Sequence, residues 1–165
     1  MLFKKKTYEL EKSEIKKIIE LKDTHWKYGL QEQRKWFDKN IKNEDIHLFQ
    51  LNKKKIYAYV VFRKVYLFIK NKKRRGYLRD TLIINKKLNF FDLFNFLKES
   101  NKIIKKKTSV LFCPKNLIKL NLIIGWKKHK LIKNFNLKNK QLNCMVFNLK
   151  NKELIAKIEL FNKNL

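Results

Sequence analysis

The chain has 165 residues, of which 44% are hydrophobic and 13% aromatic. This composition excludes a chain that is disordered throughout, and the length is enough for one domain with a buried core. The formal charge is +28, and a strongly basic balance favours nucleic acid or another anionic partner. Only five of the 42 basic residues are arginine, whereas nucleic-acid readers favour arginine for its paired hydrogen bonds. We therefore attribute more of the charge to a compositional bias towards lysine and asparagine than to a selected polyanion site.

The sequence predicts neither a secretory signal nor a membrane span. Residues 1–6 lack an apolar segment, and the longest apolar run, 56–69, is interrupted by Arg63 and Lys64. The two cysteines, Cys113 and Cys144, fall in expected strands without metal-ligand spacing. We expect two buried, reduced thiols, no metal site and a cytoplasmic protein.

The first half of the chain reads as one strand, two helices and three strands. Ser13 suits the N-cap of the first helix, and Ile15 and Ile18 begin its apolar face. Runs rich in β-branched and aromatic residues, separated by short polar turns, indicate the three strands. The expected strands are 6–10, 45–51, 56–70 and 77–85, the helices are 13–21 and 30–41, and the turns are 52–55 and 71–76.

The second half begins with an amphipathic helix over 90–100, because apolar residues from Phe90 to Leu97 follow helical spacing. A strand at 108–113 then leads to Pro114, which suits the first turn of a helix. Gly125 is expected to close that helix in the left-handed conformation. Two more strands are expected at 130–133 and 142–149, and Leu154, Ile158 and Phe161 predict a short terminal helix.

The resulting order is β-α-α-β-β-β-α-β-α-β-β, an α/β fold with a mixed sheet. The segment from Leu120 to Trp126, with Asn121 in its helix and the pair Gly125-Trp126 at its end, resembles the C-terminal half of the GNAT superfamily of acyl-CoA N-acyltransferases. The order of elements is also that of this family. We expect one GNAT-like domain over residues 1–150, followed by a tail over 151–165 that forms a short helix.

The resemblance extends into the first half of the chain and covers about residues 2–149. There the pattern is similar to that of bacterial members linked to acetylation of surface sugars or other small amines. The matching residues are Lys22, Asp23, His25, Trp26, Gln33, Trp36, Asp45, Ile46 and His47.

The resemblance implies that acetyl-CoA binds where the fourth and fifth strands separate, with its pyrophosphate at the start of the third helix. The backbone groups of Ile83, Ile84 and Asn85 would then contact the cosubstrate. The loop that follows contains Lys86 and Lys87 but lacks the glycines that let backbone approach phosphate closely. The chain is therefore a divergent member, and the two lysines are either phosphate contacts or ordinary solvated residues.

The catalytic residues follow from the same resemblance. Asn121 stands where many members have a tyrosine that protonates the departing thiolate. A base must deprotonate the amine, and the candidates are His47, Asp80 and His25; alternatively, His47 is a core residue and Asp80 an ion-pair partner. His25 and Trp26 would line the acceptor site. We expect direct transfer to the amine without an acyl intermediate on Cys113, which has no activating partner in the sequence.

These features predict an N-acyltransferase, in particular an N-acetyltransferase, that acts on an amine of a small molecule; an amino sugar is one candidate. Two alternatives remain open from the sequence. One is a GNAT-fold pseudoenzyme that has lost its cosubstrate. The other is a basic protein that binds nucleic acid without sequence preference: Arg75-Gly76-Tyr77 begins like an aromatic RNA-recognition signature, which the following residues break. The acceptor, the acyl group and the oligomeric state are left open.

Overall fold

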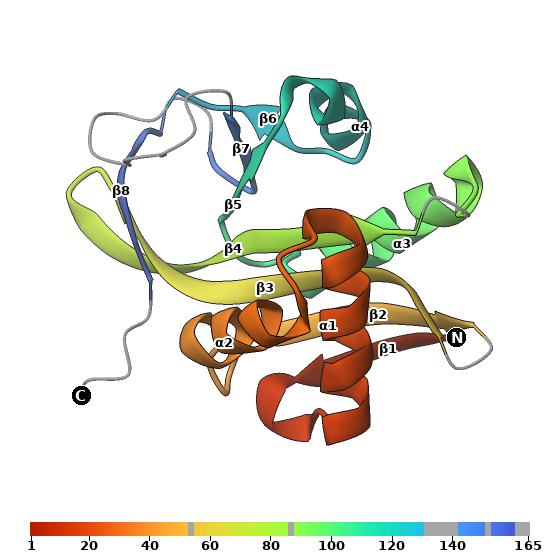
Figure 1. Cartoon of the computed structure of the whole chain (residues 1–165). Helices are drawn as coiled ribbons and strands as arrows, with labels where there is room; N and C mark the ends of the chain where they lie inside the picture. Colours follow the sequence, from red (N-terminus) through yellow and green to blue (C-terminus); the bar gives the residue numbers. More distant parts are fainter. Residues whose placement is uncertain (53–54, 86–87, 131–141, 151–152, 161–165) are drawn as a thin grey trace. The chain divides into compact units, whose positions relative to one another are not determined.

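The computed structural model describes residues 1–52, 55–85, 88–130, 142–150 and 153–160. These residues form four α-helices and an eight-stranded mixed sheet (Figure 1). The strand order is β1-β2-β3-β4-β5-β7-β6, and β8 pairs with β3. The chain divides into two compact units, Met1–Arg63 with Thr81–Leu97 and Lys64–Asp80 with Lys98–Leu165. The long strands β3 (Lys55–Ile69) and β4 (Lys72–Ile84) contribute to both.

The first unit begins with an antiparallel pair of strands. β1 is an edge strand that pairs along its whole length with β2, and Phe3 stacks on Phe49 with 5.4 Å between the ring centroids. The expectation of a first strand at 6–10 is wrong, because β1 ends at Lys6 and a 3-10 helix follows. Lysines suit such an edge, where their charge discourages pairing with other chains. The elements of this unit before β3 are β1 (Leu2–Lys6), η1 (Thr7–Glu9), α1 (Lys12–Trp26), α2 (Leu30–Asn40) and β2 (Ile46–Asn52).

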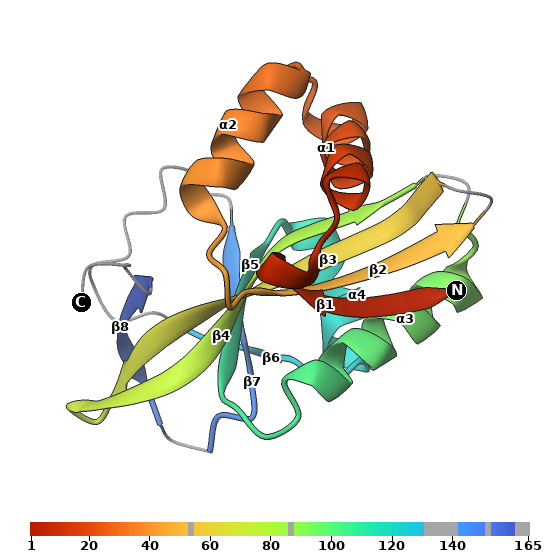
Figure 2. The same ribbon diagram turned by 90° about the horizontal axis from the view of Figure 1, so that it is seen from below.

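The helices α1 and α2 lie on the same face of β1–β3 (Figure 2). α1 begins at a capping box formed by Glu11 and Glu14, so Ser13 is not the N-cap. It continues through residues 22–26, which we expected to be a loop, and the ammonium of Lys22 lies 3.4 Å from the ring centroid of Trp36 on α2. One buried hydrophobic cluster of this unit consists of Ile18, Leu21, Phe37, Ile41, Phe49, Ile56, Tyr59, Val61 and Ile83.

The turn between β3 and β4 consists of Lys70 and Asn71, which have φ angles of +49° and +60°. Two consecutive residues at positive φ are typical of a type I′ hairpin turn. The turn expected at 71–76 is wrong, because Gly76 lies inside β4. A Cβ at Gly76 would lie 2.4 Å from the carbonyl oxygen of Thr108, so glycine is needed there for close packing of two backbones.

This turn provides a prediction. The double substitution Lys70→Asn/Asn71→Gly is expected to raise the free energy of unfolding by about 1 kcal/mol, because Asn-Gly adopts positive φ with less strain than Lys-Asn. Urea denaturation measures the change. Asn43→Gly, at an exposed residue outside the hairpin, is the control and should give no gain. A hairpin variant no more stable than wild type would contradict the assigned turn.

The second unit contains the parallel pairing of β4 with β5. Residues Tyr77–Arg79 of β4 pair in parallel with Ser109–Leu111 of β5, and β7 pairs with β5 in the antiparallel direction. Gly125 has a φ of +93° and ends the helical segment, as predicted. Of the strand expected at 130–133, the last three residues lie outside the described ones. The remaining elements are α3 (Phe90–Ile103), β5 (Ser109–Cys113), η2 (Lys115–Leu117), α4 (Ile118–Ile123), β6 (Lys127–Lys128), β7 (Asn143–Phe147) and β8 (Ile155–Leu160).

The terminal helix expected from residue 154 onwards is wrong, because β8 pairs with the outer part of β3. The register shifts by one residue, so Ile155 lies opposite Ile69 while Ile158 lies opposite Leu67. This β-bulge places Ile155 and Ile158 on the same face despite their spacing of three. The expected helix was based on Leu154, Ile158 and Phe161; Leu154 precedes β8 and is exposed, and Phe161 lies outside the described residues. One buried hydrophobic cluster of this unit consists of Val65, Leu67, Ile69, Leu78, Val110, Val146, Ile155 and Ile158.

The expected order of elements up to β7 is confirmed. Within the described residues, no helix is long and apolar enough to cross a membrane.

Candidate functional site

The end of β4 and the start of α3 carry the residues expected to contact acetyl-CoA. Ile83 is buried, whereas Ile84 and Asn85 are half-buried. The backbone N–H of Asn85 donates to the carbonyl of Tyr57 on β3 at 2.7 Å, so this group is already used inside the protein. Lys86 and Lys87 lie outside the described residues.

The first turn of α3 is capped by its own side chains. The N–H of Asp92 donates to Oδ1 of Asn89 at 2.8 Å, and Nδ2 of Asn89 donates to the Asp92 carboxylate at 2.8 Å. This arrangement occupies one of the N–H groups that a helix start otherwise offers to an anion, and it adds a negative charge there. The side chains of Phe90 and Phe91 are 67% and 70% exposed. The cap therefore leaves fewer free N–H groups at this helix start.

Asn121 lies in α4 and is 1% exposed. Its Oδ1 accepts a short hydrogen bond from Nη2 of Arg79 on β4, and its Nδ2 donates to the carbonyl of Leu117 at 2.8 Å. Both ends of the amide are therefore engaged within the second unit. Sequence reasoning did not identify the Arg79 contact, which joins residues 42 positions apart.

Arg79 is a fully buried cation. Its guanidinium carbon lies 4.8 Å from the ring centroid of Trp126, and Nη1 has no hydrogen-bond partner among the described residues. The indole of Trp126 in turn donates to Oδ1 of Asn101 at 3.0 Å. Burial lowers the pKa of Arg79 to about 9, so the guanidinium is still charged at neutral pH. A buried charge with so few partners is costly, which makes this cluster sensitive to substitution.

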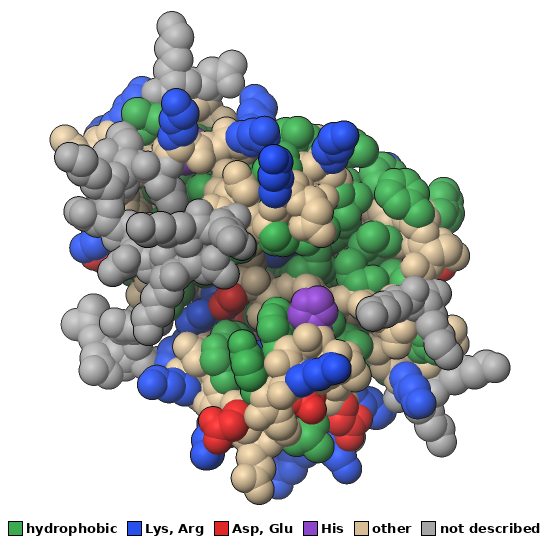
Figure 3. Space-filling view, turned by 45° about the horizontal axis from the view of Figure 1, so that its top comes forward, with side chains coloured by type: hydrophobic (Ala, Val, Ile, Leu, Met, Phe, Trp, Pro, Cys, Tyr) green, Lys and Arg blue, Asp and Glu red, His purple; other side chains and the backbone are tan. Residues whose placement is uncertain are grey.

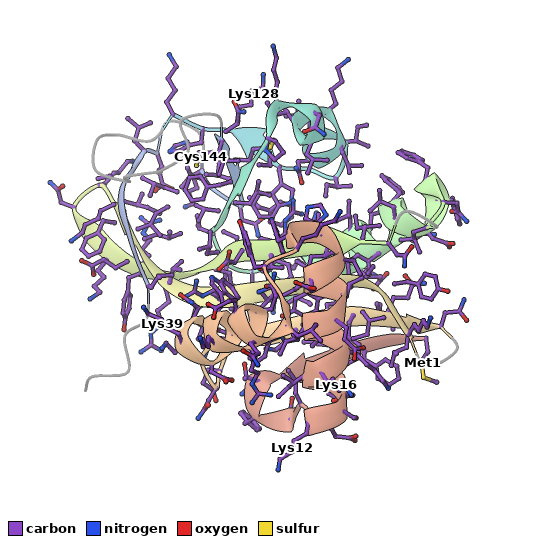
Figure 4. The ribbon with its side chains drawn as sticks, in the orientation of Figure 1. Met1, Lys12, Lys16, Lys39, Lys128 and Cys144 are labelled. Atoms are coloured by element: carbon purple, nitrogen blue, oxygen red, sulfur yellow. The ribbon has the colours of Figure 1, made fainter. Side chains whose placement is uncertain are left out.

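Cys113 lies beside this cluster, so its basic neighbour is Arg79, a residue far from it in the sequence. Burial raises the pKa of the Cys113 thiol, while the Arg79 charge and a hydrogen bond from Asn121 oppose the rise. Cys144 lies on β7 (Figure 4), and burial raises the pKa of its thiol to about 12. Cys113 pairs with Asn143 and Cys144 with Phe112 in the β5–β7 ladder. Successive residues of a strand face opposite sides, so the two free thiols point away from each other.

His47 is a fully buried residue of β2 in the first unit. Its Nδ1 lies 2.8 Å from the Tyr59 hydroxyl, and its Nε2 lies 2.9 Å from the Thr7 hydroxyl. Burial lowers the pKa of His47 to about 3, so the ring is neutral at physiological pH. The arrangement suits a core histidine better than a base in contact with substrate.

The buried ring predicts a loss of stability in acid. The folded pKa lies below the unfolded value of about 6.5, so the unfolded chain takes the proton first as the pH falls. His47 alone is expected to reduce the free energy of unfolding by about 3 kcal/mol between pH 6.5 and pH 4.

Urea denaturation of wild type and His47→Gln at both pH values isolates this contribution. The variant should lose about 3 kcal/mol less than wild type over this interval. His25→Gln removes an exposed ring and should match wild type. Equal losses in wild type and His47→Gln would contradict the assignment.

The other predicted residues occupy different places. His25 and Trp26 are exposed at the end of α1, with their rings in an edge contact at 4.8 Å. Asp80 is half-buried on β4, and strand alternation turns it away from the face of Arg79. Among the described residues, no group of His, Cys, Asp and Glu could hold a metal ion.

Solved structures share this fold. The chain is similar to Escherichia coli ElaA, with a TM-score of 0.65, 9% identity and coverage of 89% of this chain and 98% of that one. It is also similar to an acyl-CoA N-acyltransferase from Pseudomonas aeruginosa, with a TM-score of 0.66, 8% identity and coverage of 89% of this chain and 98% of that one. A third similar structure is a GNAT family acetyltransferase from Brucella melitensis, solved in complex with acetyl-CoA. Its TM-score is 0.63 and its identity 10%, and the match covers 98% of this chain and 96% of that one. No family model and no curated protein matches the sequence. This chain therefore has the fold of the GNAT acyl-CoA N-acyltransferases.

Proposed function

We propose that the chain is an acyl-CoA-dependent N-acyltransferase that moves an acetyl group to an amine of a small molecule, such as an amino sugar. The observation that carries this proposal is the fold match over nearly the whole of both chains with an acetyltransferase bound to acetyl-CoA. The two free, buried cysteines fit an enzyme of a reducing compartment, the cytoplasm.

Each step can be assigned to residues of this chain. The backbone of Ile83 and Ile84 would hold the pantetheine arm of acetyl-CoA. Asp80 would accept the proton of the amine, whose nitrogen attacks the thioester carbonyl; the new C–N bond forms as the C–S bond breaks. The leaving thiolate would take a proton from solvent, because Asn121 stands where many relatives have a proton-donating tyrosine. His25 and Trp26 would contact the acceptor.

Calorimetric titration with acetyl-CoA tests this function. We expect weak binding, because each hydrogen bond to phosphate that a glycine-rich loop would have supplied is worth about 1.5–3 kcal/mol. Asp92→Asn keeps a hydrogen-bond acceptor for Asn89 but removes the carboxylate from the start of α3. It should tighten binding about two- to fivefold.

Glu99→Gln is the matched control, since it removes the same charge from an exposed ion pair with Lys102 later in α3. It should leave the affinity unchanged. No heat at millimolar acetyl-CoA would contradict the enzyme and favour the pseudoenzyme, which the buried Asn121 and the capped α3 also fit. Release of CoA that depends on an added amine would then distinguish an active transferase from a protein that only binds.

The nucleic-acid alternative draws less support from the surface. Lysine and arginine side chains are scattered over the visible face instead of forming one continuous track (Figure 3). Exposed lysines such as Lys12 and Lys16 lie along α1 (Figure 4). Such scattered charges support only weak binding that is lost as salt is raised.

A further inference from the structure

A pocket of about 270 Å³ lies within the second unit and has no part in the proposed transfer. It is lined by residues of β3, β4 and the segment before β5, namely Lys64, Arg75, Gly76, Tyr77 and Lys107. Three of the five lining residues are cationic and none is acidic.

The walls of the pocket are fixed by backbone contacts. The N–H of Tyr77 donates to the carbonyl of Thr108 at 3.3 Å. A Cβ at Gly76 would also lie 2.6 Å from Cδ1 of Leu67, so β4 is tightly packed at this position. Sites built on strands hold their groups more firmly than sites on free loops.

The loop that carries Lys107 is held by Asn148. Its Nδ2 donates to the carbonyls of Ile104, Lys105 and Lys107 at 3.1, 2.7 and 3.3 Å. The Ser109 hydroxyl donates to the Lys107 carbonyl at 3.2 Å. The backbone that positions the Lys107 ammonium is therefore fixed before any ligand arrives.

Two of the three cationic side chains at the pocket have no counter-charge within the described part of the chain. Among the described residues, Arg75 and Lys107 form no ion pair, whereas their neighbours do. Arg74 pairs with Glu153 at 3.3 Å, and Lys73 approaches Glu159 at 3.8 Å. Glu153 and Glu159 thus pair with residues next to the pocket, and the two cations that lack a counter-charge, Arg75 and Lys107, favour an anion.

We propose that this pocket binds the phosphate group of a phosphorylated small molecule. The planar guanidinium of Arg75 can form two parallel hydrogen bonds to phosphate oxygens, and Lys107 adds a point charge. A cationic amine, the acceptor class of the proposed transferase, would be repelled. Arg75 is one of only five arginines in a chain dominated by lysine, and both Arg75 and Lys107 are exposed, so a ligand in solution can reach them.

Titration with inorganic pyrophosphate, followed by ³¹P NMR at 0.15 M salt, tests the proposal, since such salt screens diffuse attraction beyond about 8 Å. Wild type should bind with a dissociation constant of about 1 mM or tighter. Arg75→Gln/Lys107→Gln should weaken binding at least about tenfold. The control Lys105→Gln/Lys106→Gln also removes two positive charges, but from exposed residues outside the pocket. It should change the affinity less than about twofold.

Equal weakening in the two double variants would overturn the proposal, because it would show attraction to net charge alone. Absence of binding to wild type would also overturn it. Loss of RNA-oligonucleotide binding in the pocket variant, without pyrophosphate binding in wild type, would replace it with a nucleic-acid site. If the proposal holds, competition by acetyl-CoA would trace the phosphate to the cosubstrate, and no competition to a separate phosphorylated ligand.

Discussion

Replacing Asp80 by Asn is expected to lower the turnover of amine acetylation by about 10²–10⁴-fold, the effect typical of removing a general base. Asp80 is preferred to His47 as the base because His47 is enclosed and neutral whereas Asp80 is half-buried, and the third candidate, His25, is assigned to contact with the acceptor. The asparagine has nearly the same shape but cannot accept the amine proton. Affinity for acetyl-CoA should therefore be unchanged, and steady-state rates with titration of acetyl-CoA separate the two quantities.

Two variants serve as controls for this prediction. Cys113→Ser should be nearly neutral in rate, because direct transfer needs no thiol and the buried thiol stays protonated. His47→Gln should retain most of the turnover at pH 7.5, once its rate is corrected for the folded fraction. Full activity of Asp80→Asn, or an acyl group trapped on Cys113 in mass spectra, would show that the chemistry is assigned to the wrong residues.

The order of elements could be predicted because each long element has a clear period in the sequence. Apolar residues from Phe90 to Leu97 mark α3, and the β-branched run around Val60 marks β3. The turn between β3 and β4 could not be located in the same way. Lys70 and Asn71 adopt left-handed conformations although neither is glycine. The nearby Gly76, which lies inside β4, led us to expect the turn at 71–76.

The candidate site was harder to predict than the fold. Asn121 was found by its position before Gly125-Trp126, but its contact with Arg79 depends on the pairing of β4 with β5, which no local pattern contains. One signal was available. Alternation along β4 places Arg79 on the same face as Thr81 and Ile83, which are both buried. A charged residue on a buried face indicates a specific partner.

That partner gives the last prediction. Asn121→Leu is expected to reduce the free energy of unfolding by about 3–5 kcal/mol, because it leaves a buried guanidinium without its amide acceptor. Arg79 already has one unpartnered nitrogen, Nη1. Losing the hydrogen bond of Nη2 would leave the charge facing Trp126 and the Cys113 thiol. Urea denaturation at pH 7 measures the change.

The double variant Arg79→Met/Asn121→Leu is expected to lie within about 1 kcal/mol of wild type, because replacing both members of a buried polar pair with apolar groups of similar size is nearly neutral. Arg79→Met alone should fall between the two, since it leaves the Asn121 carbonyl oxygen without its donor. The double-mutant cycle thus yields a large coupling energy. Additive losses in the two single variants would show that Arg79 and Asn121 act independently, and the buried cation would then need another source of stabilisation.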